Sequence, residues 1–85
     1  EGFEKVQIAL PEGELDRTVI ENAGVEVLSF KTLGRVSTVI TKGDKADITA
    51  KLSDLSPAVL ELVPLTLEEI FIYEMEVHGY ANSEE

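Results

Sequence analysis

The sequence predicts a small α+β domain in which four strands and two helices are followed by a third helix. Three observations support this class. Four short segments are rich in β-branched and alternating apolar residues, two segments between them carry apolar residues at helical spacing, and a capping signature precedes the last apolar segment. With 85 residues, the chain has the length of one domain, spanning 1–85. Since it begins with Glu1 rather than Met, we expect it to be a piece of a longer protein.

The beginning of the chain predicts one strand and one short helix. Apolar side chains alternate with other residues over 3–10, which indicates a half-buried strand that Pro11 ends. Apolar residues at helical spacing then predict a helix over 13–22, and Gly24 follows as a C-terminal stop signal.

The next segment predicts a β-hairpin. Two β-rich runs, Val25–Lys31 and Arg35–Thr41, are separated by a short turn over 32–34. Gly34 supplies the positive φ that a tight connection commonly needs.

A second helix and a fourth strand complete the predicted sheet domain. Asp44 is a suitable N-cap for a helix over 45–55, and Pro57 prevents its continuation. The run Ala58–Val63 predicts a strand that Pro64 ends. The order βαββαβ is that of the ferredoxin-like fold, a four-stranded antiparallel sheet whose right-handed crossovers place both helices on one face.

Both faces of this sheet are expected to carry apolar side chains. In the first hairpin strand, alternation places Leu28 and Phe30 opposite Val25 and Val27, and in the second it places Val36 and Ile40 opposite Val39. The face without helices therefore needs a cover, which either the C-terminal helix or another chain would provide.

The C-terminal helix is predicted over 67–78 from its start signal. Thr66 followed by Glu69 forms a capping box, in which each side chain accepts a hydrogen bond from the other residue's backbone N–H. Leu65 and Ile70 are spaced for a hydrophobic staple, and Gly79 provides the stop. We expect 66–79 to be an interaction helix.

The apolar residues of this helix occupy two stripes rather than one. One stripe holds every fourth residue from Leu67, a second begins at Ile70, and Ile72 stands apart on the flank. Two stripes fit either a helix buried deeply in its own domain or a helix packed between the sheet and a partner. We expect the second arrangement, with an interface formed by Leu67, Ile70, Phe71, Ile72, Tyr73 and Met75.

Composition excludes several classes of function. With 17 acidic and 7 basic residues, the net charge of −10 repels the nucleic-acid backbone. The absence of Cys excludes disulfides and thiolate metal sites, and no apolar run approaches the length needed to insert in a membrane. Glu74 and His78 are spaced to share a metal, but a solvated His near the helix end is the simpler interpretation. We therefore expect no catalytic, cofactor-binding or metal-binding residue in this chain.

The segment "LTLEEIFIYEM", Leu65 to Met75, resembles the closing segment of ATP-binding subunits of ABC transporters, particularly bacterial ABC-2-type export systems. The distinctive block is Leu67-Glu68-Glu69-Ile70-Phe71, and the "KVQIAL" strand and "VLSF…GRVSTVIT" hairpin before it resemble the same accessory region in order and spacing. The chain itself contains no phosphate-loop motif, no LSGGQ-like signature and no strand ending in Asp-Glu. None of the family's ATP-site residues transfers to this sequence.

The resemblance implies a non-catalytic C-terminal accessory or dimerisation domain. ATP and Mg²⁺ would be bound only by an ATPase domain preceding Glu1, and the partners would be a second copy, the chain's own ATPase domain and, in the whole complex, a membrane permease. The location implied is cytoplasmic, peripheral to the inner face of the cell membrane. The alternative is a regulatory domain that senses a small ligand at the loops "IALPEGELD" and "ITKGDKAD".

Overall fold

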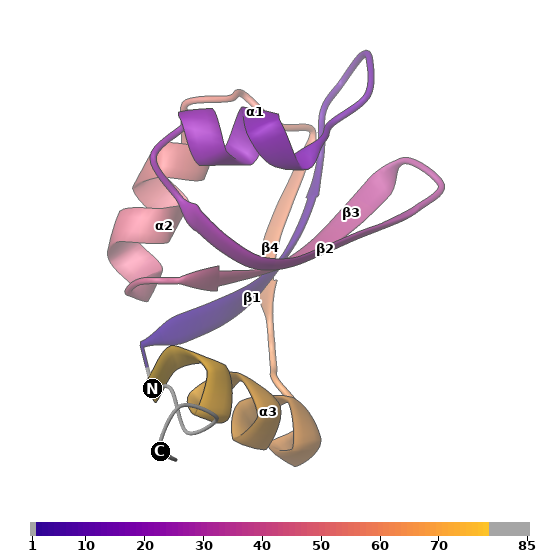
Figure 1. Ribbon diagram of the computed structural model, residues 1–85. Helices are drawn as coiled ribbons and strands as arrows, with labels where there is room; N and C mark the ends of the chain where they lie inside the picture. Colours follow the sequence, from indigo (N-terminus) through magenta and orange to yellow (C-terminus); the bar gives the residue numbers. More distant parts are fainter. Residues whose placement is uncertain (1, 79–85) are drawn as a thin grey trace.

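The computed structural model describes residues 2–78, which form four strands and three helices (Figure 1). None of these helices is long and apolar enough to cross a membrane. In chain order the elements are β1 (Phe3–Ala9), α1 (Arg17–Asn22), β2 (Glu26–Leu33), β3 (Val36–Lys42), α2 (Lys45–Ser53), β4 (Val59–Val63) and α3 (Leu67–His78).

The four strands form one antiparallel sheet in the order β2-β3-β1-β4. β1 lies in the middle, where Val6 is paired with Val39 of β3 on one side and with Leu62 of β4 on the other. This order, with helices connecting β1 to β2 and β3 to β4, confirms the predicted ferredoxin-like arrangement with one added helix.

The main core lies between the sheet and the helices α1 and α2. Val6 and Ile8 of β1 are fully buried on this face, against Ile20 of α1 and Ile48 and Leu52 of α2. Figure 1 shows α1 and α2 on the same side of the twisted sheet, with α3 on the other side. The prediction that both crossover helices share one face is therefore confirmed.

Helix α1 begins later than the predicted 13–22. Its N-cap is Asp16, whose side chain accepts a hydrogen bond from the backbone N–H of Val19 at 3.1 Å. Because a capping side chain satisfies a free N–H of the first turn, it marks the true start of a helix. Leu15, which the prediction placed inside the helix, is instead a buried residue of the preceding loop.

The β2–β3 hairpin is longer and tighter than predicted. Leu33 and Val36 are paired, so the turn consists of Gly34 and Arg35 rather than residues 32–34. Gly34 has a φ of +65°, as expected of the first central residue in a two-residue hairpin turn. The role predicted for this glycine is confirmed, whereas the boundaries of the turn were wrong.

A β-bulge in β2 corrects the predicted direction of Phe30. The register shifts between Val27 and Ser29, which leaves Leu28 as the extra residue. After the bulge Phe30 is paired with Val39 and packs against the main core, on the same face as Val27. The second face of the sheet is therefore less apolar than strict alternation predicts.

The remaining elements agree with prediction to within two residues at each end. α2 is capped by Asp44, whose carboxylate accepts a hydrogen bond from the N–H of Asp47 at 3.1 Å. It ends at Ser53 rather than at residue 55, and Ser56 then takes a left-handed φ of 53° before Pro57. β4 follows immediately as an edge strand of the sheet.

Helix α3 covers one end of the second sheet face. In β1, Phe3 and Lys5 point away from the main core, because they alternate with Glu4 and Val6. Both contact α3 through their side chains, and Phe3 is only 1% exposed. The expected cover of this face is thus supplied partly by the chain's own C-terminal helix.

Candidate protein interface

The start of α3 is determined by the predicted capping box. The Thr66 N–H donates to Glu69 Oε1 at 2.9 Å, and the Glu69 N–H donates to Thr66 Oγ1 at 3.1 Å. The Ile70 N–H donates to the Thr66 carbonyl at 2.9 Å, the first backbone hydrogen bond of the helix. The first two bonds satisfy donors that a helix start otherwise leaves unpaired. Gly79, the predicted stop, lies outside the described residues.

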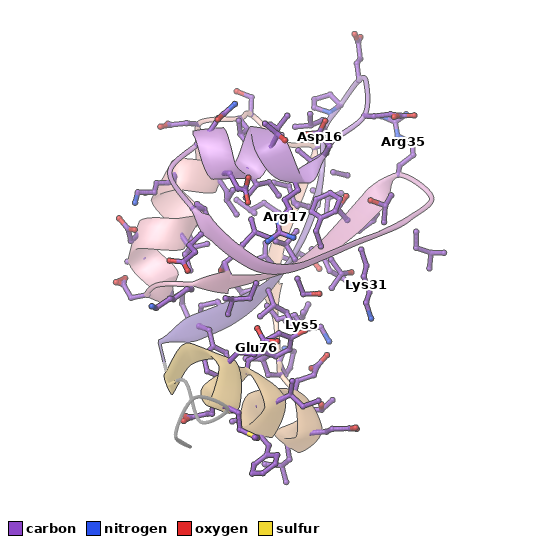
Figure 2. The ribbon with its side chains drawn as sticks, in the orientation of Figure 1. Lys5, Asp16, Arg17, Lys31, Arg35 and Glu76 are labelled. Atoms are coloured by element: carbon purple, nitrogen blue, oxygen red, sulfur yellow. The ribbon has the colours of Figure 1, made fainter. Side chains whose placement is uncertain are left out.

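One side of α3 is held against β1 by an aromatic pair and an ion pair. The rings of Phe3 and Tyr73 lie with their centroids 6.3 Å apart at an interplanar angle of 56°, a tilted geometry that aromatic pairs favour. Lys5 Nζ donates to both carboxylate oxygens of Glu69, at 2.9 and 3.1 Å. Figure 2 shows Lys5 on the side of the sheet that faces α3. The two contacts determine which side of the helix faces inward.

Glu69 therefore serves the helix cap and the docking contact at once. Its carboxylate accepts from the Thr66 backbone N–H and from Lys5. The hydrogen bond from Thr66, followed by that from Lys5, lowers the pKa of Glu69 below its ordinary value. The ionised form is thus the one that the folded state stabilises.

Glu69→Gln is expected to make the free energy of unfolding depend less on pH in the acid range. Because the folded-state pKa of Glu69 is lowered, its carboxylate stabilises the fold above the ordinary Glu pKa of about 4.3. This contribution is lost as the pH falls through the lower folded value. Urea unfolding of the wild type and of Glu69→Gln should be measured between about pH 7 and about pH 3. The difference in their free energies of unfolding should be largest at neutral pH and should shrink in acid.

Glu12→Gln, in the exposed loop after β1, is the matched control for this measurement. It removes the same charge without touching the cap. Its free energy of unfolding should therefore stay close to that of the wild type over the whole pH range. A Glu69→Gln difference that does not change with pH would contradict the role assigned to this carboxylate.

The opposite side of α3 carries large apolar side chains in contact with solvent. Leu67 is 85% exposed, Phe71 66% and Met75 36%, and Ile72 beside them is 42% exposed. We call Leu67, Phe71 and Met75 the outward stripe. These three residues, with Ile70 and Glu74, line a shallow hollow on the helix surface. A row of exposed apolar residues is typical of a surface that contacts another protein.

The structure separates the six residues predicted for the interface into two groups. Ile70 and Tyr73 are half-buried, and Tyr73 packs on Phe3 of the chain's own sheet. Leu67, Phe71, Ile72 and Met75 are exposed. Deep burial of α3 within its own domain is therefore excluded, and four of the six predicted residues face outward.

The described residues contain no group of three or more His, Cys, Asp or Glu side chains arranged to hold a metal ion. Of the candidate pair Glu74 and His78, the His78 side chain lies outside the part of the chain that the structure describes. Two other glutamates of the helix, Glu68 and Glu69, lie in its first turn, where negative charge complements the helix dipole.

The two loops considered for a small ligand lie at opposite ends of the sheet. The loop over 10–16 follows β1, while the loop over 43–44 follows β3, whose last residue Lys42 is paired with Phe3 at the start of β1. The first loop instead approaches the β2–β3 turn, where Arg35 donates to the carbonyls of Leu10 and Pro11 at 3.1 and 2.9 Å. Figure 2 shows Arg35 between these two projecting loops. Sequence reasoning treated Arg35 only as a hairpin residue and missed this contact.

The Lys5–Glu69 ion pair was also missed, because 64 residues separate its partners in the chain. The only available signal was the placement of Lys5 among the residues of β1 that point away from the main core.

Comparisons of the chain with protein-family models, with curated proteins and with solved structures find no match.

Proposed function

We propose that this chain is a non-catalytic interaction domain that presents the outward stripe of α3 to a partner protein. The exposure of Leu67, Phe71 and Met75 on a helix with a fully specified start and inner side is the observation that supports this function. Burying one such side chain contributes about 1.5–3 kcal/mol, so a contact over the stripe would contribute substantially to association. The sheet domain serves as a rigid support that orients the helix.

The setting that we propose comes from the resemblance of Leu65 to Met75. In that setting the domain follows the ATPase part of a bacterial ABC-2-type export protein at the inner face of the membrane, and α3 contacts the ATPase body, a second copy or the membrane permease subunit. The gene sequence before Glu1 tests this setting. A phosphate loop, an LSGGQ-like signature and a strand ending in Asp-Glu would support it, and their absence would overturn the setting but not the role of α3.

A photoreactive benzoylphenylalanine at position 71, in the full gene and native host, should test the interaction. We expect irradiation to give one discrete cross-linked product, because position 71 would lie inside the contact. Leu33 is 88% exposed on the hairpin and serves as a matched apolar position outside the stripe. The same group at position 33 should not give that product, and Leu67→Asp should abolish the product from position 71. No product from position 71, or the same products from both positions, would overturn the proposal.

Small-ligand sensing is the second candidate, favoured by the hollow between the loop over 10–16 and the hairpin. Its lining includes Arg35, Glu14, Thr32 and Ser37, which offer a cation, a carboxylate and two hydroxyls. A ligand that binds the folded state raises the midpoint of thermal unfolding as its concentration increases. A thermal-shift screen of charged and polar metabolites should produce such a response if this candidate is correct, and Arg35→Ala should remove it.

A further inference from the structure

Within residues 67–76, the charged residues that flank the outward stripe of α3 are acidic. At about 100° per residue, Glu68 and Glu74 flank the stripe on its two sides, and Glu74 lines the hollow at Phe71. Between Leu67 and Glu76 the helix contains no Lys or Arg. Lys5 bonds to Glu69 on the inner side of α3, away from the stripe. A partner therefore meets an apolar stripe with negative edges.

A second copy of the chain fits this surface poorly. In a two-fold symmetric contact the same residues meet on both subunits, so an α3–α3 pair places Glu68 and Glu74 near their own counterparts. Each chain also carries a net charge of −10. Like charges facing one another across an interface oppose association and disfavour that partner.

A lipid surface fits equally poorly. Helices that lie on membranes carry Lys and Arg on their polar face, because membrane surfaces on the cytoplasmic side are anionic. The described part of α3 carries the opposite charge, with Glu68, Glu74 and Glu76 next to its exposed apolar residues. An anionic membrane surface would repel these glutamates and keep the apolar stripe from inserting.

We infer that the occupant of the outward stripe is a basic amphipathic helix of a different protein, with apolar residues at helical spacing flanked by Lys or Arg. This inference rests on the proposed interaction function. The apolar side chains of that helix would lie along Leu67, Phe71 and Met75, and one of them would enter the hollow. Its cations would face Glu68 and Glu74, which provides specificity and accelerates association.

The test uses three synthetic peptides and isothermal titration calorimetry. The first has Leu at i, i+3, i+4 and i+7 and Lys elsewhere, the second has Glu in place of Lys, and the third is a scrambled form of the first. We expect only the first to bind. Phe71→Asp should weaken binding at least about tenfold although it adds negative charge, since burial of the ring is lost.

Paired charge variants then show whether the Lys peptide is attracted by the charges beside the stripe or by the net negative charge of the whole protein. Glu68→Gln with Glu74→Gln should weaken binding several-fold at low salt, and the effect should shrink at high salt because screening reduces it. The control, Glu12→Gln with Glu14→Gln, removes the same charge from the exposed loop after β1 and should leave binding nearly unchanged.

Five results would overturn the inference, four from measurements on the isolated domain and one from comparison with the cross-linking. The first four are equal binding of the scrambled peptide, equal binding of the Glu peptide, equal effects of the two charge pairs, or a dimer in sedimentation that is tighter than peptide binding and is lost in Phe71→Asp. Such a dimer would leave the interaction function standing, with a second copy as the partner. Cross-linking from position 71 without binding of the basic peptide would likewise contradict only the inference.

Discussion

Phe3→Ala is expected to lower the free energy of unfolding by about 3–5 kcal/mol. The side chain of Phe3 is 1% exposed although it lies on the face opposite the main core, because α3 covers it and Tyr73 packs against its ring. Truncation removes the buried ring and leaves a cavity between β1 and α3. Urea unfolding measured by circular dichroism should show the loss as a lower midpoint.

Hydrogen exchange adds a local readout to the same variant. Since Phe3 holds α3 on the sheet, Phe3→Ala should accelerate exchange of the α3 amides more than that of the central strands β1 and β3. Leu33→Ala is the control, because Leu33 is 88% exposed and its loss should change stability by no more than about 0.5 kcal/mol. Equal stability of Phe3→Ala and Leu33→Ala would contradict the packing of α3 described above.

Leu52→Ala is expected to lower the free energy of unfolding by about 2–5 kcal/mol. This variant changes the main core, on the face of the sheet that α1 and α2 cover. Leu52 is fully buried, in a cluster that contains Ile20 of α1 and Val6 and Val39 of the central strands. Its removal leaves a cavity in the main core, which unites both crossover helices with the sheet. The midpoint of urea unfolding should fall accordingly.

The pattern of exchange should distinguish this variant from Phe3→Ala. Leu52→Ala should leave α3 docked, so that its amides gain no more exchange than those of β1 and β3. Selective release of α3 in Leu52→Ala would mean that the two faces of the sheet do not form separate packing units.

The fold was predictable from the sequence wherever its signal is local. Alternation, helical spacing, short β-rich runs and capping signals predict all seven elements, because each signal lies within the element or next to it in the chain. The bulge at Leu28 was not predictable, because an extra residue in a strand has no distinctive composition, and it reversed the expected direction of Phe30. The start of α1 was misplaced because the buried Leu15 completes a helical pattern while lying in a loop.

The candidate interface was predictable in part for the same reason. The capping box depends on residues three apart, so Thr66 and Glu69 predict the start of α3 correctly. Which stripe faces the sheet depends instead on Phe3 and Lys5, which lie far away in the chain. Since both stripes are apolar, hydrophobicity alone does not decide between them.

Solvent paramagnetic relaxation by NMR tests the division of α3 between its own sheet and a partner most directly. In the free protein, a soluble gadolinium chelate should relax Leu67, Phe71 and Met75 more strongly than the half-buried Ile70 and Tyr73. On addition of the partner identified by cross-linking at position 71, the outward stripe should become protected and the inner residues should stay protected. An outward stripe that is already protected in the free protein, or that stays exposed in the complex, would contradict the proposed role of α3.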